Sequence, residues 1–181
     1  MRDVAIIATA RTPVTRAFRG AFNRTHGASL AGHAVAQALS RSGLDPAEID
    51  DVVMGCAMPE GATGYNIGRL AALRAGLPVS ASGATIDRQC ASGLQAIALA
   101  AYRIMHDGVE AVVAGGVESI SLVQKTEGEM FARDEELGQQ HPDIWMNMLE
   151  TAEIVAGRYG VSRDRQDAFA VESQARALKA Q

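Results

Sequence analysis

Apolar residues along the chain alternate between short continuous runs and segments with helical spacing. The short runs predict strands at about Val4 to Ala10, Asp51 to Ala57, Ala84 to Arg88 and Val109 to Ala114. Between them, apolar residues recur at steps of three and four, which predicts helices from a cap at Ser29 to the residue before Gly43, over Ile67 to Ala75, and after Cys90. The alternation indicates an α/β fold, a sheet with helices packed on its faces.

The predicted helix after Cys90 is the most apolar of these segments. No charged side chain occurs between Ala91 and Tyr102. We therefore expect a central helix that is buried nearly all round, with only its far end in solvent.

Cys90 stands where a predicted strand turns abruptly into that helix. A thiol at this junction faces the free N–H groups and the positive end of the helix dipole, which favours the thiolate and so a nucleophile. The alternative is that Cys90 is a small apolar residue of the core. Cys56, at the end of a predicted buried strand, is interpreted as such a core residue.

The last third of the chain has a different pattern. The segment from about Ser119 to Trp145 is irregular, with glycines, a proline and a charged run, and long excursions of this kind are often functional or disordered. From the predicted cap Ser162, a helical pattern continues to Gln181. We divide the chain into an α/β core, residues 1–118, and a second part, residues 119–181.

Composition excludes several classes of function. The chain has 181 residues, 48% of them hydrophobic, and a net charge of −4, with no basic patch dense enough for nucleic acid. Two cysteines make neither a metal cluster nor a disulfide framework, which favours a reducing compartment, the cytoplasm. The sequence has no recognisable secretory signal and no segment long enough to span a bilayer.

The residues around Cys90 resemble those of a known family. The segment Asp87-Arg88-Gln89-Cys90-Ala91-Ser92-Gly93-Leu94-Gln95-Ala96 resembles the nucleophile segment of the thiolases, enzymes that make and cleave 3-ketoacyl-CoA thioesters, including acetyl-CoA acetyltransferases. Further similar stretches follow in the family's order: Arg11-Thr12-Pro13, Gly20-Ala21-Phe22, Asn66-Ile67-Gly68-Arg69, Ala75-Gly76-Leu77-Pro78, Ala114-Gly115-Gly116-Val117-Glu118-Ser119 and Ser162 to Ala170.

The resemblance implies a thiolase-like layered fold: a mixed sheet with helices on both faces, a central helix starting at Cys90, and the start of the loop domain that covers the active site in residues 119–181. Thiolases also have an Asn-Glu-Ala-Phe segment, a Gly-His-Pro segment and a second reactive cysteine, and this sequence has none of them. The chain therefore resembles the N-terminal half of a thiolase. The expected partners are the C-terminal half and further copies, since thiolases are dimers or tetramers.

The resemblance also implies a reaction. Cys90 would attack an acyl-CoA thioester, carry the acyl group and pass it to a second acetyl-CoA, or cleave a 3-ketoacyl-CoA with CoA in reverse. The backbone N–H of Cys90 would donate to the oxyanion. Coenzyme A thioesters are the expected substrates, with no metal and no tightly bound cofactor. We expect no turnover from this chain alone. The alternative is a non-catalytic thiolase-fold protein that binds CoA thioesters or a partner subunit.

Asn147 and Met148 are the candidate substrate contacts of the second part. They align with a family segment in which some biosynthetic members have histidine at the position of Asn147 and glycine is common at that of Leu149. These departures leave the acyl-chain preference open. The alternative is that the methionines of this segment pack a core.

Overall fold

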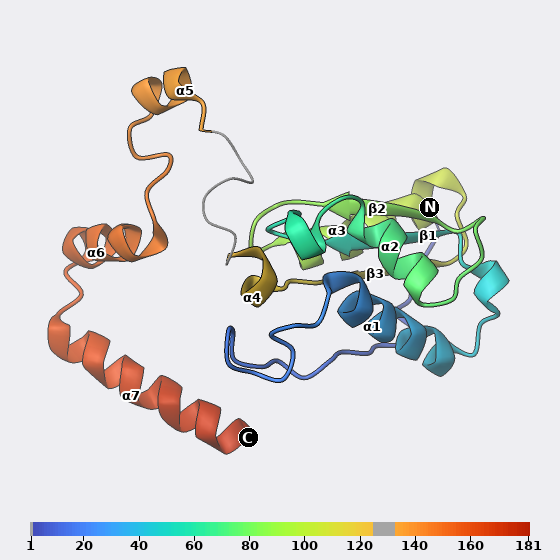
Figure 1. Cartoon of the computed structure of the whole chain (residues 1–181), viewed down its shortest axis with the longest axis horizontal. Coiled ribbons are helices and arrows are strands. Elements are labelled where there is room, and N and C mark those ends of the chain that lie inside the picture. Colours follow the sequence, from blue (N-terminus) through green and yellow to red (C-terminus); the bar gives the residue numbers. More distant parts are fainter. Residues whose placement is uncertain (1, 125–132) are drawn as a thin grey trace. The chain divides into compact units, whose positions relative to one another are not determined.

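The computed structural model describes residues 2–124 and 133–181. The chain divides into two compact units, Met1–Phe131 and Ala132–Gln181, and each is described by itself (Figure 1). The boundary predicted from the sequence, after residue 118, lies before the boundary between these two units. Helix α4 (Ile120–Val123) belongs to the first unit, where Ser121 Oγ accepts a hydrogen bond of 2.8 Å from the Phe18 N–H.

A parallel sheet of three strands forms the centre of the first unit. Strand β1 (Asp51–Gly55) lies between β2 (Ser82–Ile86) and β3 (Val112–Gly116), and all five of its residues are buried. These three strands confirm the predicted ones to within a few residues. The described strands are all parallel, whereas the resemblance implied a mixed sheet. The connections between them run over a face of the sheet through a helix, which returns the chain in the same direction.

The predicted first strand, Val4 to Ala10, is wrong for the residues that the structure describes. This segment is not paired into the sheet, and the side chains of Ile6 and Ile7 are 75% and 62% exposed. A polar contact holds it locally, since the Arg41 guanidinium donates to the carbonyl of Thr9 at 2.6 Å. Apolar and β-branched composition favours extended backbone, but a strand also needs a neighbour for its hydrogen bonds.

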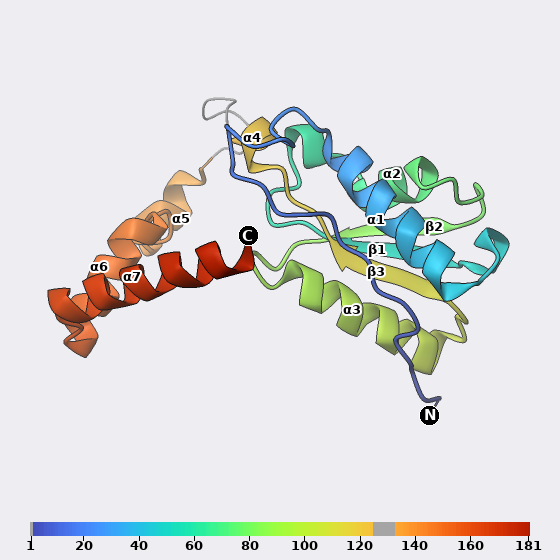
Figure 2. The same cartoon turned by 90° about the horizontal axis from the view of Figure 1, so that it is seen from below.

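Helices cover both faces of the sheet, as predicted. Figure 2 shows α1 (Gly27–Ser42) and α2 (Ile67–Arg74) on one side and α3 (Ser92–Tyr102) on the other. Helix α1 begins two residues before the predicted cap Ser29, because His26 Nδ1 accepts from the Ala28 N–H, and it ends at Gly43 with a positive φ of 75°. The core lies between these two helices and the sheet; its most buried large side chains include Val35, Val52 and Ile67.

Helix α3 departs from its prediction at its start, at its far end and in its burial. It begins at Ser92 rather than at Cys90, with Ala91 as its cap, and it continues into a π-helical turn, η3 (Arg103–Asp107). Only the side facing the sheet is buried, through Ser92, Ala96 and Ala100, while Leu94 is 74% exposed. Packing on a single sheet face buries one stripe of a helix, so its apolar outer side stays open in the part of the chain described here.

The second unit consists of helices in its described part. These are α5 (Glu135–Gln140), α6 (Met148–Tyr159) and α7 (Arg163–Ala180), and none of them contains a buried residue. Ser162 caps α7 as predicted, accepting from the Arg165 N–H. Of the expected irregular segment, residues 125–132 lie outside the described residues. Two 3-10 turns, η1 (Pro46–Glu48) and η2 (Gly61–Thr63), complete the first unit. Among the described helices, none is both long and apolar enough to cross a membrane.

Candidate active site

A hydrogen-bonded turn carries Cys90 from β2 to α3. Gln89 has a positive φ of 49°, which is uncommon for a residue with a side chain. The Asp87 carboxylate accepts from the Gln89 N–H at 2.8 Å. The Ser92 hydroxyl accepts from the Arg88 N–H at 2.9 Å and donates to the Gln89 carbonyl at 2.5 Å. Side chains on both sides of Gln89 therefore hold the strained backbone directly before Cys90.

Glycines at the ends of two strands let the start of α3 approach the sheet. A β-carbon on Gly55, the last residue of β1, would lie 2.5 Å from the amide nitrogen of Gly93. A β-carbon on Gly116, the last residue of β3, would lie 3.4 Å from the Gly93 Cα. The Cys90 turn therefore rests on the carboxyl ends of parallel strands, the edge at which open α/β sheets bind their ligands.

Cys90 is exposed and lines a cavity of ≈ 550 Å³ at this edge. The walls come from the Cys90 turn, the start of α3 and the segments that follow β1 and β3. The lining residues are Gly55, Ala57, Met58, Gln89, Cys90, Ser92, Gly93, Gly116, Val117, Glu118 and Ile120. The size is that of a small-molecule site. The exposed thiol in this cavity contradicts the alternative of a core cysteine.

Glu118 joins two walls of the cavity. One oxygen of its carboxylate, Oε2, accepts from the backbone N–H groups of Ala57 at 3.1 Å and Met58 at 3.2 Å. The other, Oε1, is 3.8 Å from the Cys56 thiol, which donates to it. Sequence reasoning singled out no role for Glu118. Its only signal was its place in the stretch Ala114 to Ser119 that resembles the thiolases.

Cys56 is a core residue, as predicted. It is 1% exposed at the end of β1. Burial raises the pKa of its thiol above the ordinary value of 9.0, and the negative charge of Glu118 raises this pKa further. Cys56 is therefore a protonated thiol at neutral pH, and Cys90 is the nucleophile candidate of the two cysteines.

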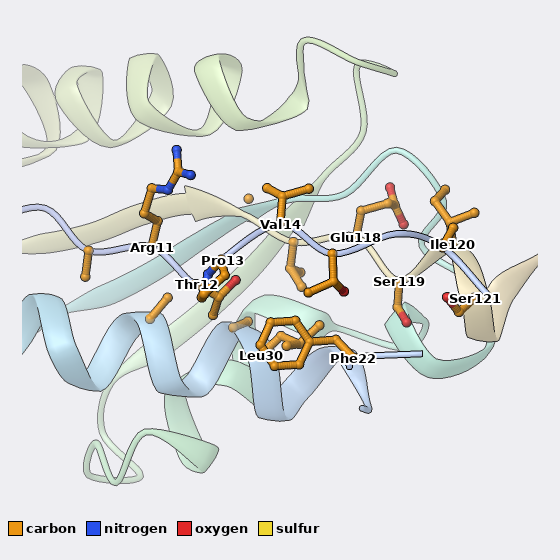
Figure 3. Close-up of a pocket in the computed structure, with 17 residues that line it drawn as sticks. Arg11, Thr12, Pro13, Val14, Phe22, Leu30, Glu118, Ser119, Ile120 and Ser121 are labelled. Carbon is orange, nitrogen blue, oxygen red and sulfur yellow. The ribbon is translucent and has the colours of Figure 1, made fainter. Parts of the chain in front are cut away.

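A second cavity, of ≈ 470 Å³, shares Gly116, Val117, Glu118 and Ile120 with the wall of the Cys90 cavity, and Figure 3 shows the residues that line it. Its walls are the opening segment around Arg11 to Val14, the apolar side of α1 at Leu30, and Gly116 to Ser121. Glu118 lines both cavities. The stretch Arg11-Thr12-Pro13, which resembles a thiolase segment, thus lies near Gly116 to Ser121. Part of that segment also lines the Cys90 cavity.

The other candidate site residues belong to the second unit. Asn147 caps α6, and its Oδ1 accepts from the N–H groups of Leu149 and Glu150 at 3.0 Å each. Met148 is 76% exposed, so it does not pack a core in the described residues. Their role toward substrate stays a prediction. In residues 2–124 and 133–181, no group of three or more His, Cys, Asp or Glu residues is arranged to hold a metal ion.

Comparison with known proteins identifies the family of this chain. Residues 4–181 match the family model described as "Thiolase, N-terminal domain". The chain is 41% identical to a 3-ketoacyl-CoA thiolase of Bacillus subtilis over 99% of this chain and 46% of that protein. It is 36% identical to a 3-ketoacyl-CoA thiolase of Escherichia coli, again over 99% of this chain and 46% of that protein.

One solved structure has a fold similar to that of this chain. The crystal structure of the Bacillus anthracis acetyl-CoA acetyltransferase superimposes with a TM-score of 0.79 at 36% identity, over 97% of this chain and 46% of that one. This chain therefore spans about half the length of the relatives it matches. Because the family model covers nearly all of it, the chain belongs to the thiolase family, matching that family's N-terminal domain.

Proposed function

We propose that this chain is the nucleophile-bearing half of a thiolase-type acyltransferase, with Cys90 as the residue that carries the acyl group. The observation that carries the proposal is the exposed Cys90 thiol in a cavity at the carboxyl edge of the parallel sheet, on a strand-to-helix turn. Membership of the thiolase family supports it. The substrates are coenzyme A thioesters, and no tightly bound cofactor or metal takes part.

The reaction proceeds in two acyl transfers. The Cys90 sulfur attacks the thioester carbonyl carbon, a new carbon–sulfur bond forms, and the bond to the CoA sulfur breaks so that CoA leaves. The oxygen of the tetrahedral intermediate carries the negative charge, and the backbone N–H of Cys90 is one donor to it. The acyl group then moves from Cys90 to the α-carbon of a second acetyl-CoA: the carbon–carbon bond forms, the bond to the Cys90 sulfur breaks, and the α-proton goes to the second reactive cysteine that the family resemblance places in the complementary half. In the cleavage direction Cys90 attacks the 3-keto carbon of a 3-ketoacyl-CoA, the bond to the α-carbon breaks, acetyl-CoA leaves with a proton on that carbon, and the acyl group then moves from Cys90 to free CoA.

Two groups needed for turnover are absent from the sequence. The proton acceptor for Cys90 and the second reactive cysteine belong, by the family resemblance, to a Gly-His-Pro segment and a glycine-flanked cysteine that these 181 residues lack. Turnover therefore requires a complementary C-terminal half. The working enzyme is a cytoplasmic homo-oligomer. Asn147 and Met148 at the start of α6 contact the substrate in the assembled protein.

One experiment tests both the nucleophile and the need for a partner. The purified chain is incubated with acetyl-CoA, alone and with the C-terminal half of the Bacillus subtilis relative, and acylated cysteines are mapped by mass spectrometry. Acetylation confined to Cys90, absent in Cys90→Ser, supports the proposal. Thiolysis of acetoacetyl-CoA is measured in parallel, and we expect none from the chain alone. Robust Cys90-dependent turnover by the chain alone would contradict the need for a partner.

A second candidate function is a non-catalytic protein that binds CoA thioesters or a partner subunit. The open apolar side of α3, with Leu94 74% exposed, favours a partner of some kind. No acyl adduct on Cys90 under any complementation, together with retained CoA-thioester binding in a calorimetric titration, would favour this candidate over the enzyme.

A further inference from the structure

Glu118 occupies a position where the ends of two strands meet. It lies two residues after the last residue of β3, and its carboxylate bonds to the two residues that follow Cys56 after the end of β1. Between these segments, the Val117 N–H also donates to the Gly55 carbonyl at 3.0 Å. The carboxylate thus continues the pairing of β1 and β3 beyond the sheet.

The segments joined in this way are walls of the Cys90 cavity. Ala57, Met58 and Glu118 all line it. The glycines at the strand ends, Gly55 and Gly116, let the first turn of α3 pack directly against the sheet. A change in the spacing of the two strand ends would therefore alter both the wall of the cavity and the base on which the Cys90 turn rests.

We infer that Glu118 is a positioning residue for the Cys90 cavity: its carboxylate fastens the backbone after β1 to the segment after β3 and fixes the cavity wall. A carboxylate suits this task, because one oxygen accepts two N–H groups and the other remains for the Cys56 thiol. Among the described contacts, the carboxylate bonds to backbone and to Cys56 and not to Cys90, so it acts through the wall.

The first test does not depend on the proposed function. It uses Cys56 as a reporter, since this thiol is 1% exposed and lies next to the fastened backbone. The full chain is treated with iodoacetamide under native conditions, and the ratio of Cys56 to Cys90 modification is mapped. In Glu118→Ala we expect this ratio to rise about tenfold or more, because local opening no longer breaks charged hydrogen bonds. Glu118→Gln, which keeps an acceptor oxygen and nearly the same shape, should show a smaller rise.

Two control variants separate the local effect from general loss of stability. Glu110→Ala changes an exposed glutamate that precedes β3, at its opposite end, and should leave the ratio unchanged. Leu39→Ala, in the core side of α1, lowers overall stability without touching the strand ends. If Cys56 in Glu118→Ala is no more reactive than in Leu39→Ala at matched urea midpoints, the inference is overturned. Should Glu118→Ala not fold, the same comparison is made with Glu118→Gln.

The second test rests on the proposed function. With the C-terminal half of the Bacillus subtilis relative present, we expect the rate of Cys90 acetylation by acetyl-CoA to fall about tenfold or more in Glu118→Ala, since acyl transfer needs the thioester held in place. Alkylation of the exposed Cys90 by iodoacetamide, which needs no cavity, should change by less than about twofold. If both rates fall together, or neither falls, Glu118 does not position the cavity. If the wild-type chain is never acetylated even with the C-terminal half present, the proposed function fails, and the Cys56 reporter alone still decides the role of Glu118.

Discussion

The backbone of Gly55 at the end of β1 lies against that of Ser92 at the start of α3, with no room for a β-carbon between them. Such a carbon on Gly55 would lie 2.5 Å from the next amide nitrogen, that of Gly93, and closer still to the Ser92 carbonyl group. Neither backbone segment is a flexible side chain that can move aside. Gly55 therefore sets how closely the turn that bears Cys90 approaches the sheet.

Gly55→Ala should push the start of α3 away from β1 and destabilise the first unit by roughly 1–3 kcal/mol, the cost of overpacking. Urea unfolding followed by circular dichroism measures this loss. Gly93→Ala, at the start of α3 on the other side of this contact, is the matched control, because its β-carbon would meet no neighbour closer than 3.9 Å. Equal stability of the two variants would contradict the close contact.

Ser92→Ala should weaken the turn directly. The hydroxyl is the partner of both the Arg88 N–H and the Gln89 carbonyl, and Ser92 is buried. Loss of these bonds should cost about 1–3 kcal/mol of unfolding free energy. Under the proposed function it should also slow Cys90 acetylation. Ser80→Ala, at an exposed serine, should change stability by less than about 0.5 kcal/mol. A Ser92→Ala chain as stable as Ser80→Ala would show that Gln89 keeps its conformation without this hydroxyl.

Local periodicity was sufficient to predict the helices and strands that pack against one another within the described core. The sequence predicted β1, α1 and α2 to within a few residues, because their apolar faces meet each other. It failed for Val4 to Ala10, whose composition suits a strand but which has no paired neighbour in residues 2–124. It also failed for the outer side of α3, since an apolar stretch such as Leu94 to Ala101 does not reveal which side is covered.

Site residues, too, could be predicted where the signal is local and not where it depends on a contact formed by the fold. Cys90 was predicted as the nucleophile from its place where a strand turns into an apolar helix and from the family resemblance of its segment, and this role stays a prediction. Gln89 gave no signal, because its side chain does not favour a positive φ and only the bonds of Asp87 and Ser92 hold it there. Glu118 was missed because it bonds to residues 60 and 61 positions earlier in the chain. Such a contact exists only once parallel strands bring distant strand ends together.

An ion pair between a buried carboxylate and a partly exposed guanidinium should anchor the opposite end of α3. Asp51, 3% exposed at the start of β1, pairs with the Arg103 guanidinium just after α3 and accepts from Ser82 Oγ at 2.7 Å. Arg103→Leu leaves the carboxylate buried without its cation. Because the Arg103 side chain is 37% exposed and water screens the pair, we expect a loss of about 1–3 kcal/mol rather than the full penalty of a deeply buried charge.

Two further variants check this assignment in urea unfolding. Arg103→Leu combined with Asp51→Asn should recover part of the lost stability, since the unpaired charge is then removed. Arg163→Leu removes a comparable pair with Asp167, in which both side chains are more than half exposed, and should cost less than about 0.5 kcal/mol. Similar losses for Arg103→Leu and Arg163→Leu would contradict an anchoring role for Asp51.

The Cys56 thiol should make stability depend on pH in the alkaline range. Its pKa in the folded chain lies above the ordinary value of 9.0, first because burial disfavours the thiolate and then because Glu118 is negative. In the unfolded chain the thiol ionises near its ordinary pKa, while in the folded chain it keeps its proton. Its contribution to stability is therefore complete below pH 9 and declines as the pH rises through the folded pKa.

Urea unfolding from pH 7 to pH 10 tests this sign. The unfolding free energy of the wild-type chain should fall more steeply above pH 9 than that of Cys56→Ala, which has no group to ionise at this place. The difference between the two should be flat below pH 8, where the thiol is protonated in both states. Cys90→Ala is the matched control, because it removes the exposed cysteine and leaves Cys56 and Glu118 in place. Parallel wild-type and Cys56→Ala profiles up to pH 10 would show that the Cys56 thiol ionises as readily in the fold as outside it, against the burial and the neighbouring carboxylate found here.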